Sequence, residues 1–121
     1  MVVKRLAMFE LESQVMEILW DQGRALAPRE VQSLLPNRDL AYTTVMTVLV
    51  RLWQKQLLDR VREGRAFVYV PRLSRGDYAA RKMQEILSSS GNTNEALASF
   101  VKGIDPNDLA SLKELMQKLE E

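Results

Sequence analysis

The sequence contains neither cysteine nor histidine. These two absences exclude disulfide bonds, thiolate nucleophiles, Ser-His catalysis and the usual zinc and copper sites. Carboxylates are the only groups left that could work as a catalytic pair, and they are scattered along the chain. The sequence therefore predicts a protein that is not an enzyme and that carries no metal ion or cofactor.

Long apolar runs are also missing. No run approaches the roughly 20 residues needed to span a bilayer, so we expect no membrane insertion. Near the N-terminus, residues 6–9 form an apolar run that Glu10 ends, and this run is too short for the core of a signal peptide. Together these features predict a soluble cytoplasmic protein.

Charge of one sign is not in large excess, because the formal net charge is only +1. For the whole chain, this value argues against a strongly electrostatic nucleic-acid binder. The charges are unevenly distributed, however, since residues 1–72 carry a net charge of +3 and residues 73–121 a net charge of −2. The first part of the chain is therefore the better candidate for contact with DNA.

The most informative stretch comprises residues 41–55, which predict an amphipathic helix with two different faces. Apolar residues recur at helical spacing on one side: Val45, Val48, Leu49 and Leu52. The other side carries hydroxyls and cations and no acid: Thr43, Thr44, Thr47, Arg51 and Lys55. Hydroxyls can reach phosphates or base edges, and arginine can form two hydrogen bonds to guanine, so this face suits the major groove of DNA. The alternative is the solvated face of an ordinary core helix.

The elements expected around this helix favour the DNA-binding interpretation. A helix over residues 11–22 should end at Gly23, and a short helix with Val31, Leu34 and Leu35 on its apolar face should start at Pro28. After residue 55 the pattern changes to that of a β-hairpin with Gly64 in its turn. Three helices followed by a hairpin form a winged helix-turn-helix, so we predict a mainly α fold with this domain at residues 1–72. Two arginines at the predicted hairpin tip, Arg62 and Arg65, and Arg60 nearby would supply cations to phosphates along the wing.

Residues 73–121 predict three further short helices. About fifty residues in this arrangement offer too little interior for a core of their own. We therefore expect a helical dimerisation domain whose apolar residues contact a second copy of the chain. The residues expected at this contact are Met83, Ile86, Leu87, Leu97, Phe100, Leu109, Leu112, Met116 and Leu119. The alternative is that these helices pack back onto the first domain.

Four sequence motifs carry a family resemblance that covers nearly the whole chain. LESQVMEILW (residues 11–20), REVQSLL (29–35), YTTVMTVLVRLWQKQLL (42–58) and REGRAFVYVP (62–71) resemble the BlaI/MecI family of penicillinase repressors. The resemblance implies a homodimeric transcriptional repressor that binds palindromic operators in double-stranded DNA, upstream of β-lactam resistance (β-lactamase) genes. It also implies that repression is relieved by cleavage of the C-terminal domain, after a membrane-bound sensor protease detects the antibiotic.

The resemblance places the family's DNA-reading positions on Thr43, Thr44, Met46, Thr47 and Arg51. Met46 stands where some members have a basic residue, although methionine can still contact a thymine methyl group. Gln56 stands where many members have glycine, so the helix must end in a different cap or in a strained left-handed turn. The family's scissile bond would fall at Ser99-Phe100, with serine in place of asparagine.

Two hypotheses from other classes remain beside the repressor. The first is a winged-helix module whose threonine and arginine face binds a partner protein, which the low net charge permits. The second is an enzyme with paired carboxylates, either Glu10 and Glu12 or Asp105 and Asp108. We expect all four acids at helix starts, where capping and the helix dipole account for them.

Overall fold

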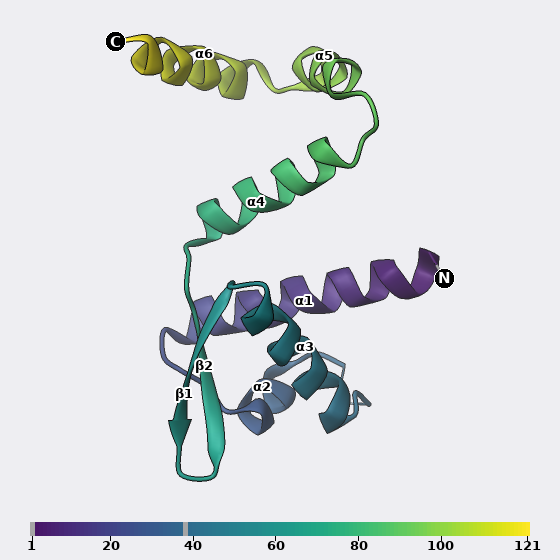
Figure 1. The fold of residues 1–121 in the computed structure, drawn as a ribbon, viewed down its shortest axis with the longest axis vertical. Coiled ribbons are helices and arrows are strands. Elements are labelled where there is room, and N and C mark those ends of the chain that lie inside the picture. The colour runs from purple at the N-terminus through teal and green to yellow at the C-terminus, as the bar shows by residue number, and fades with distance from the viewer. Residues whose placement is uncertain (1, 38) are drawn as a thin grey trace. The chain divides into compact units, whose positions relative to one another are not determined.

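The computed structural model describes residues 2–37 and 39–121, with side chains from residue 10 onward; the side chains of the apolar run at residues 6–9 lie outside this part. The elements are α1 (Val2–Gln22), α2 (Pro28–Leu34), α3 (Tyr42–Gln54), β1 (Leu58–Glu63), β2 (Ala66–Pro71), α4 (Arg75–Ser88), α5 (Thr93–Gly103) and α6 (Pro106–Glu120) (Figure 1). Contacts divide the chain into two compact units, Met1–Tyr78 and Ala79–Glu121. The predicted mainly α fold, with three helices and a hairpin in its first part, is confirmed. No helix in the described ranges is long and apolar enough to cross a membrane.

Helix α1 is longer than the sequence pattern predicted. It starts at Val2 rather than near Leu11, because no glycine or proline interrupts the chain before Gly23, whose φ of 65° ends the helix. The expectation that Glu10 and Glu12 lie at a helix start was therefore wrong. Both residues lie in the middle of α1, and Glu12 is buried.

Helix α2 begins with Pro28 as its first residue, as predicted. The Glu30 side chain accepts a hydrogen bond from the Ala27 N–H at 3.0 Å, which satisfies a donor that the helix itself leaves free. Val31 and Leu35 are buried, but Leu34 is 44% exposed, so the predicted three-residue apolar face was wrong. The buried residues of this short segment are Pro28 and Val31 of α2 and Leu35 at its C-cap.

Helix α3 packs Val45, Val48, Leu49 and Leu52 into the core of the first unit, as its apolar spacing predicted. Its C-terminal end forms a Schellman motif: Leu57 N–H donates to the Leu52 carbonyl at 2.9 Å, and Gln56 N–H donates to the Trp53 carbonyl at 2.9 Å. This motif requires a left-handed residue, and Gln56 has a φ of 65°. Of the two helix ends considered for Gln56, the structure has the strained left-handed turn.

Strands β1 and β2 form the predicted antiparallel hairpin, with Gly64 at a φ of 64° in its turn. Leu26, in the segment before α2, adds a single bridge to Tyr69 through hydrogen bonds of 2.9 and 2.8 Å. Tyr69 is fully buried and Leu58 nearly so, which fixes the base of the hairpin on the core. The rest of the hairpin extends beyond the helices to its turn (Figure 1).

The first turn of α4 belongs to the first unit. Trp20 of α1 donates a hydrogen bond to the Leu73 carbonyl at 3.0 Å and contacts Tyr78 edge to face. Arg75 pairs with Glu17 at 2.8 Å and with Asp21 at 2.6 Å. These contacts hold the segment after the hairpin against α1.

The second unit has no buried side chain between residues 79 and 121. Its helices nevertheless have well-formed N-termini, because Asn92 accepts a hydrogen bond from Glu95 N–H and Asp105 accepts one from Asn107 N–H. The sequence predicted a helix start at Asp105, and the structure confirms it. Local signals thus define these helices, while the apolar side chains of the unit are exposed or only half-buried.

Candidate nucleic-acid interface

The outward face of α3 is built from the residues that the sequence predicted. Thr43, Thr47 and Arg51 are exposed, whereas Thr44 and Met46 are half-buried. The Thr47 hydroxyl donates to the Thr43 carbonyl at 2.8 Å, which leaves its oxygen able to accept a further hydrogen bond. Arg51 forms no ion pair with any residue whose side chain the structure describes, and α3 contains no acid. The face therefore offers donors without a competing carboxylate.

A shallow hollow of about 320 Å³ lies on this face. Its lining includes Met46, Thr47 and Arg51, together with two residues that the sequence reading missed: Val50 and Gln54. The signal was available in the sequence, since Gln54 follows Arg51 by three residues and Thr47 by seven, which places it on the same helix face. An exposed glutamine beside an arginine adds a group that can pair with adenine.

Lys55 at the end of α3 lies beside Glu12 of α1, with its ammonium nitrogen 3.2 Å from the nearer carboxylate oxygen. Glu12 is only 5% exposed, so this cation compensates a carboxylate that has lost most of its water. About half of the Lys55 side chain is exposed. The lysine thus joins α3 to α1 while it also faces solvent.

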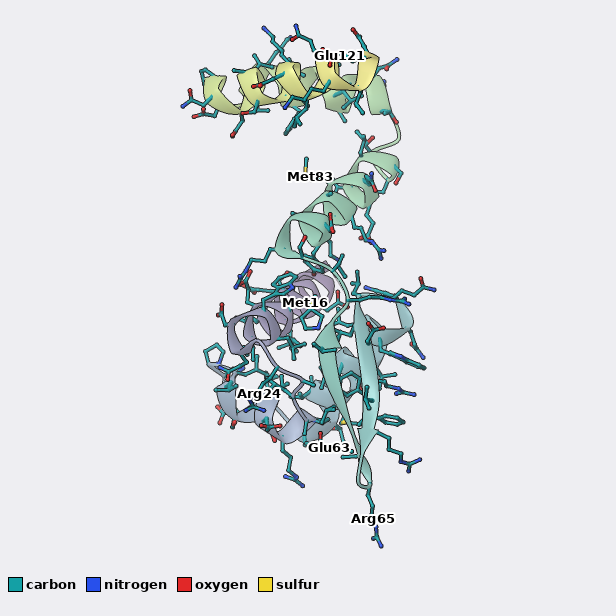
Figure 2. The ribbon with its side chains drawn as sticks, turned by 90° about the vertical axis from the view of Figure 1, so that its left-hand side faces the viewer. Met16, Arg24, Glu63, Arg65, Met83 and Glu121 are labelled. Atoms are coloured by element: carbon teal, nitrogen blue, oxygen red, sulfur yellow. The ribbon has the colours of Figure 1, made fainter. Side chains whose placement is uncertain are left out.

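The hairpin carries its cations toward the turn. Arg62 and Arg65 are both exposed, and Figure 2 shows Arg65 pointing away from the rest of the first unit at the hairpin tip. Glu63, also labelled there, is the one acid between them in sequence. Arg60, two residues before Arg62 on the same strand, lies closer to α3 than these two arginines.

The second unit presents an apolar groove of about 480 Å³ between α4 and α5. Five of the predicted dimerisation residues line it: Met83, Ile86, Leu87, Leu97 and Phe100. The four predicted residues of α6 lie outside this groove: Leu109 and Leu112 are half-buried, whereas Met116 and Leu119 are exposed. Ser99 and Phe100, the pair suggested as a cleavage site, lie inside α5.

Comparisons with known proteins match this arrangement. The penicillinase repressor family matches residues 9–118. The transcriptional regulator BlaI of Mycobacterium tuberculosis is 37% identical over 115 residues, covering 92% of this chain and 83% of that protein. The penicillinase repressor of Bacillus licheniformis is 29% identical over 114 residues, covering 93% of this chain and 88% of that protein.

A solved structure matches the first part of the chain. The solution structure of the DNA-binding domain of the repressor BlaI has a TM-score of 0.50 and 33% sequence identity, and the match covers 57% of this chain and 84% of that one. Together with the family match along almost the whole sequence, this likeness confirms the resemblance found in the motifs. The chain belongs to the penicillinase repressor family, a family of transcriptional repressors rather than enzymes.

Proposed function

We propose that the protein is a cytoplasmic, homodimeric repressor that binds palindromic operators in double-stranded DNA. The observation that carries this proposal is the outward face of α3, which presents hydroxyls and Arg51 without an acid. In a winged helix-turn-helix, this helix lies in the major groove and the hairpin lies along the phosphates. The names of the similar proteins, a transcriptional regulator and a penicillinase repressor, support the same function.

The chemistry of each side chain indicates whether it would contact a base or a phosphate of the DNA. Arg51 is the best candidate for a base contact, because its planar guanidinium can bond both acceptors of guanine. The residues that would face the same major groove of the DNA are Thr43, Thr44, Met46 and Thr47. Their hydroxyls can reach phosphates or base edges, and the thioether can contact a thymine methyl group. Lys55, Arg62 and Arg65 supply cations for phosphates at the two ends of the interface.

The second unit supports a dimer. Its 43 residues bury no side chain of their own, and the groove between α4 and α5 is apolar. Burying such a surface against a second copy removes it from water without any further partner. A symmetric pair would set two α3 helices roughly 10 to 10.5 base pairs apart, or a multiple of that spacing.

The test of DNA binding is a mobility shift with competitor DNA, followed by footprinting of the bound genomic fragments. We expect a sequence-specific shift and protected sites with dyad symmetry beside β-lactamase genes. A protein adaptor would give no sequence-specific shift, and a footprint without a dyad would contradict the symmetric dimer.

We also propose that cleavage at Ser99-Phe100 relieves repression, through a membrane-bound sensor protease. Proteases bind their substrates in an extended conformation, so α5 has to open locally before the bond is accessible. Mass spectrometry of the repressor from cells treated with a β-lactam should detect a fragment that ends at Ser99. An intact repressor under conditions that induce its target genes would contradict this route.

A further inference from the structure

Arg60 of β1 is held by two aromatic rings from different elements. Its guanidinium carbon lies 3.5 Å from the centre of the Trp53 ring, on α3, and 4.0 Å from the centre of the Phe67 ring, on β2. These distances are short for cation–π contacts, which extend to about 6 Å. The side chain is therefore fixed where the proposed recognition helix meets the wing.

The hairpin register places Arg60 on the face of the wing that continues the core. Arg60 is paired with Tyr69 and Arg62 with Phe67, and directly paired residues of an antiparallel ladder share one face. Tyr69 on this face is buried, whereas Val61 on the opposite face is 63% exposed. Arg60 and Arg62 thus lie on the side of the hairpin that turns toward α3.

The hydrogen-bond donors of Arg60 have no carboxylate acceptor among the described side chains. Other arginines of the first unit do: Arg24 pairs with Glu30, Arg72 with Asp59 and Arg75 with Glu17. Aromatic contacts cover the faces of a guanidinium and leave its N–H groups, which lie in its plane, free to donate. Arg60 is thus an oriented donor group that the protein itself does not use.

We infer that Arg60 binds a DNA phosphate and that Trp53 and Phe67 are positioning residues that aim it. The inference rests on the proposed DNA-binding function and adds a contact between those of α3 and those of the hairpin tip. A fixed guanidinium loses little conformational freedom on binding, so the contact costs less entropy than one from a mobile arginine. The same stack ties the wing to α3, so that helix and wing meet the duplex as one surface.

The first test measures the affinity of Arg60→Gln for two duplexes over a range of salt concentrations. One duplex is the operator recovered by footprinting, and the other has the same length and a scrambled sequence. Loss of one phosphate contact should weaken binding to both duplexes roughly tenfold at low salt and should reduce the slope of log K against log salt by about 1. Arg81→Gln, with the same change of charge in the second unit, should leave both values close to those of the wild type.

The second test asks whether the aromatic rings act by orienting the Arg60 guanidinium, by removing a ring while the charge of Arg60 stays in place. Trp53→Leu keeps Arg60 but removes one ring, and it should weaken operator binding in the wild-type background and have no further effect in the Arg60→Gln background. Phe67→Leu removes the other ring, whose centre also lies 5.7 Å from the Arg62 guanidinium, so its effect in the Arg60→Gln background measures the part that acts through Arg62. Thermal unfolding identifies any variant that has lost its fold.

The outcomes distinguish the inference from the function on which it rests. An unchanged salt slope for Arg60→Gln, or a loss confined to the operator duplex, would overturn the phosphate contact while DNA binding stands. Additive effects of Trp53→Leu and Arg60→Gln would overturn the positioning role. A wild-type protein that binds neither duplex would overturn the proposed function itself.

Discussion

Gln56 occupies a backbone conformation that glycine adopts more readily than any residue with a side chain. Its φ of 65° is required by the Schellman motif that ends α3 and turns the chain into β1. The side chain is exposed, and it forms no hydrogen bond or ion pair with the part of the chain that the structure describes. The strain at this position is therefore compensated by the packing around the turn, where Leu52 and Leu57 are buried.

Gln56→Gly should stabilise the protein by about 0.5 to 1 kcal/mol, because relief of the left-handed strain exceeds the added entropy of the unfolded chain. The matched control is Gln54→Gly, two residues earlier and still in the helix. That substitution should destabilise by about 0.5 to 1 kcal/mol. Urea denaturation of both variants checks the prediction, and the same sign for the two changes would contradict it.

Arg51 supplies the second prediction at this scale. Arg51→Ala should lower operator affinity by about 1 to 3 kcal/mol and, if the residue reads a base, relax the preference at one operator position. Fluorescence anisotropy with the operator and with single-base variants of it measures both effects. Wild-type affinity in Arg51→Ala would remove this residue from the interface.

At the scale of single elements, α2 shows how one cap depends on pH. Two hydrogen bonds lower the pKa of Glu30 below its ordinary value of 4.5. The one from the Ala27 N–H has the larger effect, and the one from the Arg24 side chain has the smaller effect. The folded state thus favours the ionised carboxylate. Its contribution to stability is complete above the ordinary pKa and is lost as the pH falls through the lowered pKa.

Glu30→Gln keeps an acceptor for the Ala27 N–H but removes the charge. The wild type should therefore be more stable than the variant at neutral pH, and this difference should shrink as the pH falls below 4.5. Urea denaturation at neutral pH and at about pH 3 measures the change. A difference that stays constant across this range would show that the charge of Glu30 does not contribute.

At the scale of the whole molecule, the two units differ in how they are stabilised. The first unit has a continuous core that includes Val15, Met16, Leu49 and Tyr69. The second unit has capped helices and exposed apolar side chains, among them Phe100 at 46% exposure. This contrast predicts that the first unit folds by itself and that the second gains its stability from association.

Phe100→Asp should convert the protein to a monomer, because it places a carboxylate in the apolar groove expected to meet a second copy. Ser99→Asp adds the same charge one residue earlier, outside the residues that line the groove, and should leave the dimer intact. Size-exclusion chromatography with light scattering reports the oligomeric state of both variants. A monomeric wild type, or a dimeric Phe100→Asp, would contradict the dimer proposed through this face.

The features that the sequence determined by itself are those that depend on near neighbours. The apolar spacing of α3, the glycine turn of the hairpin and the helix start at Asp105 each involve residues a few positions apart. Such signals specify local backbone conformation and, for α3, the face that the helix buries. They were sufficient for the order of elements and for the outward face of α3.

The tertiary structure alone decided the contacts between residues far apart in the chain. It paired Lys55 with Glu12, exposed Leu34 on α2 and brought Arg60 of β1 against Trp53 of α3. Periodicity assigns a residue to a face, but it does not specify which residue of another element lies opposite, because that depends on how the helices and the hairpin pack around one core. For this reason the proposed reading face could be predicted from the sequence, whereas the stack that links it to the wing required the folded chain.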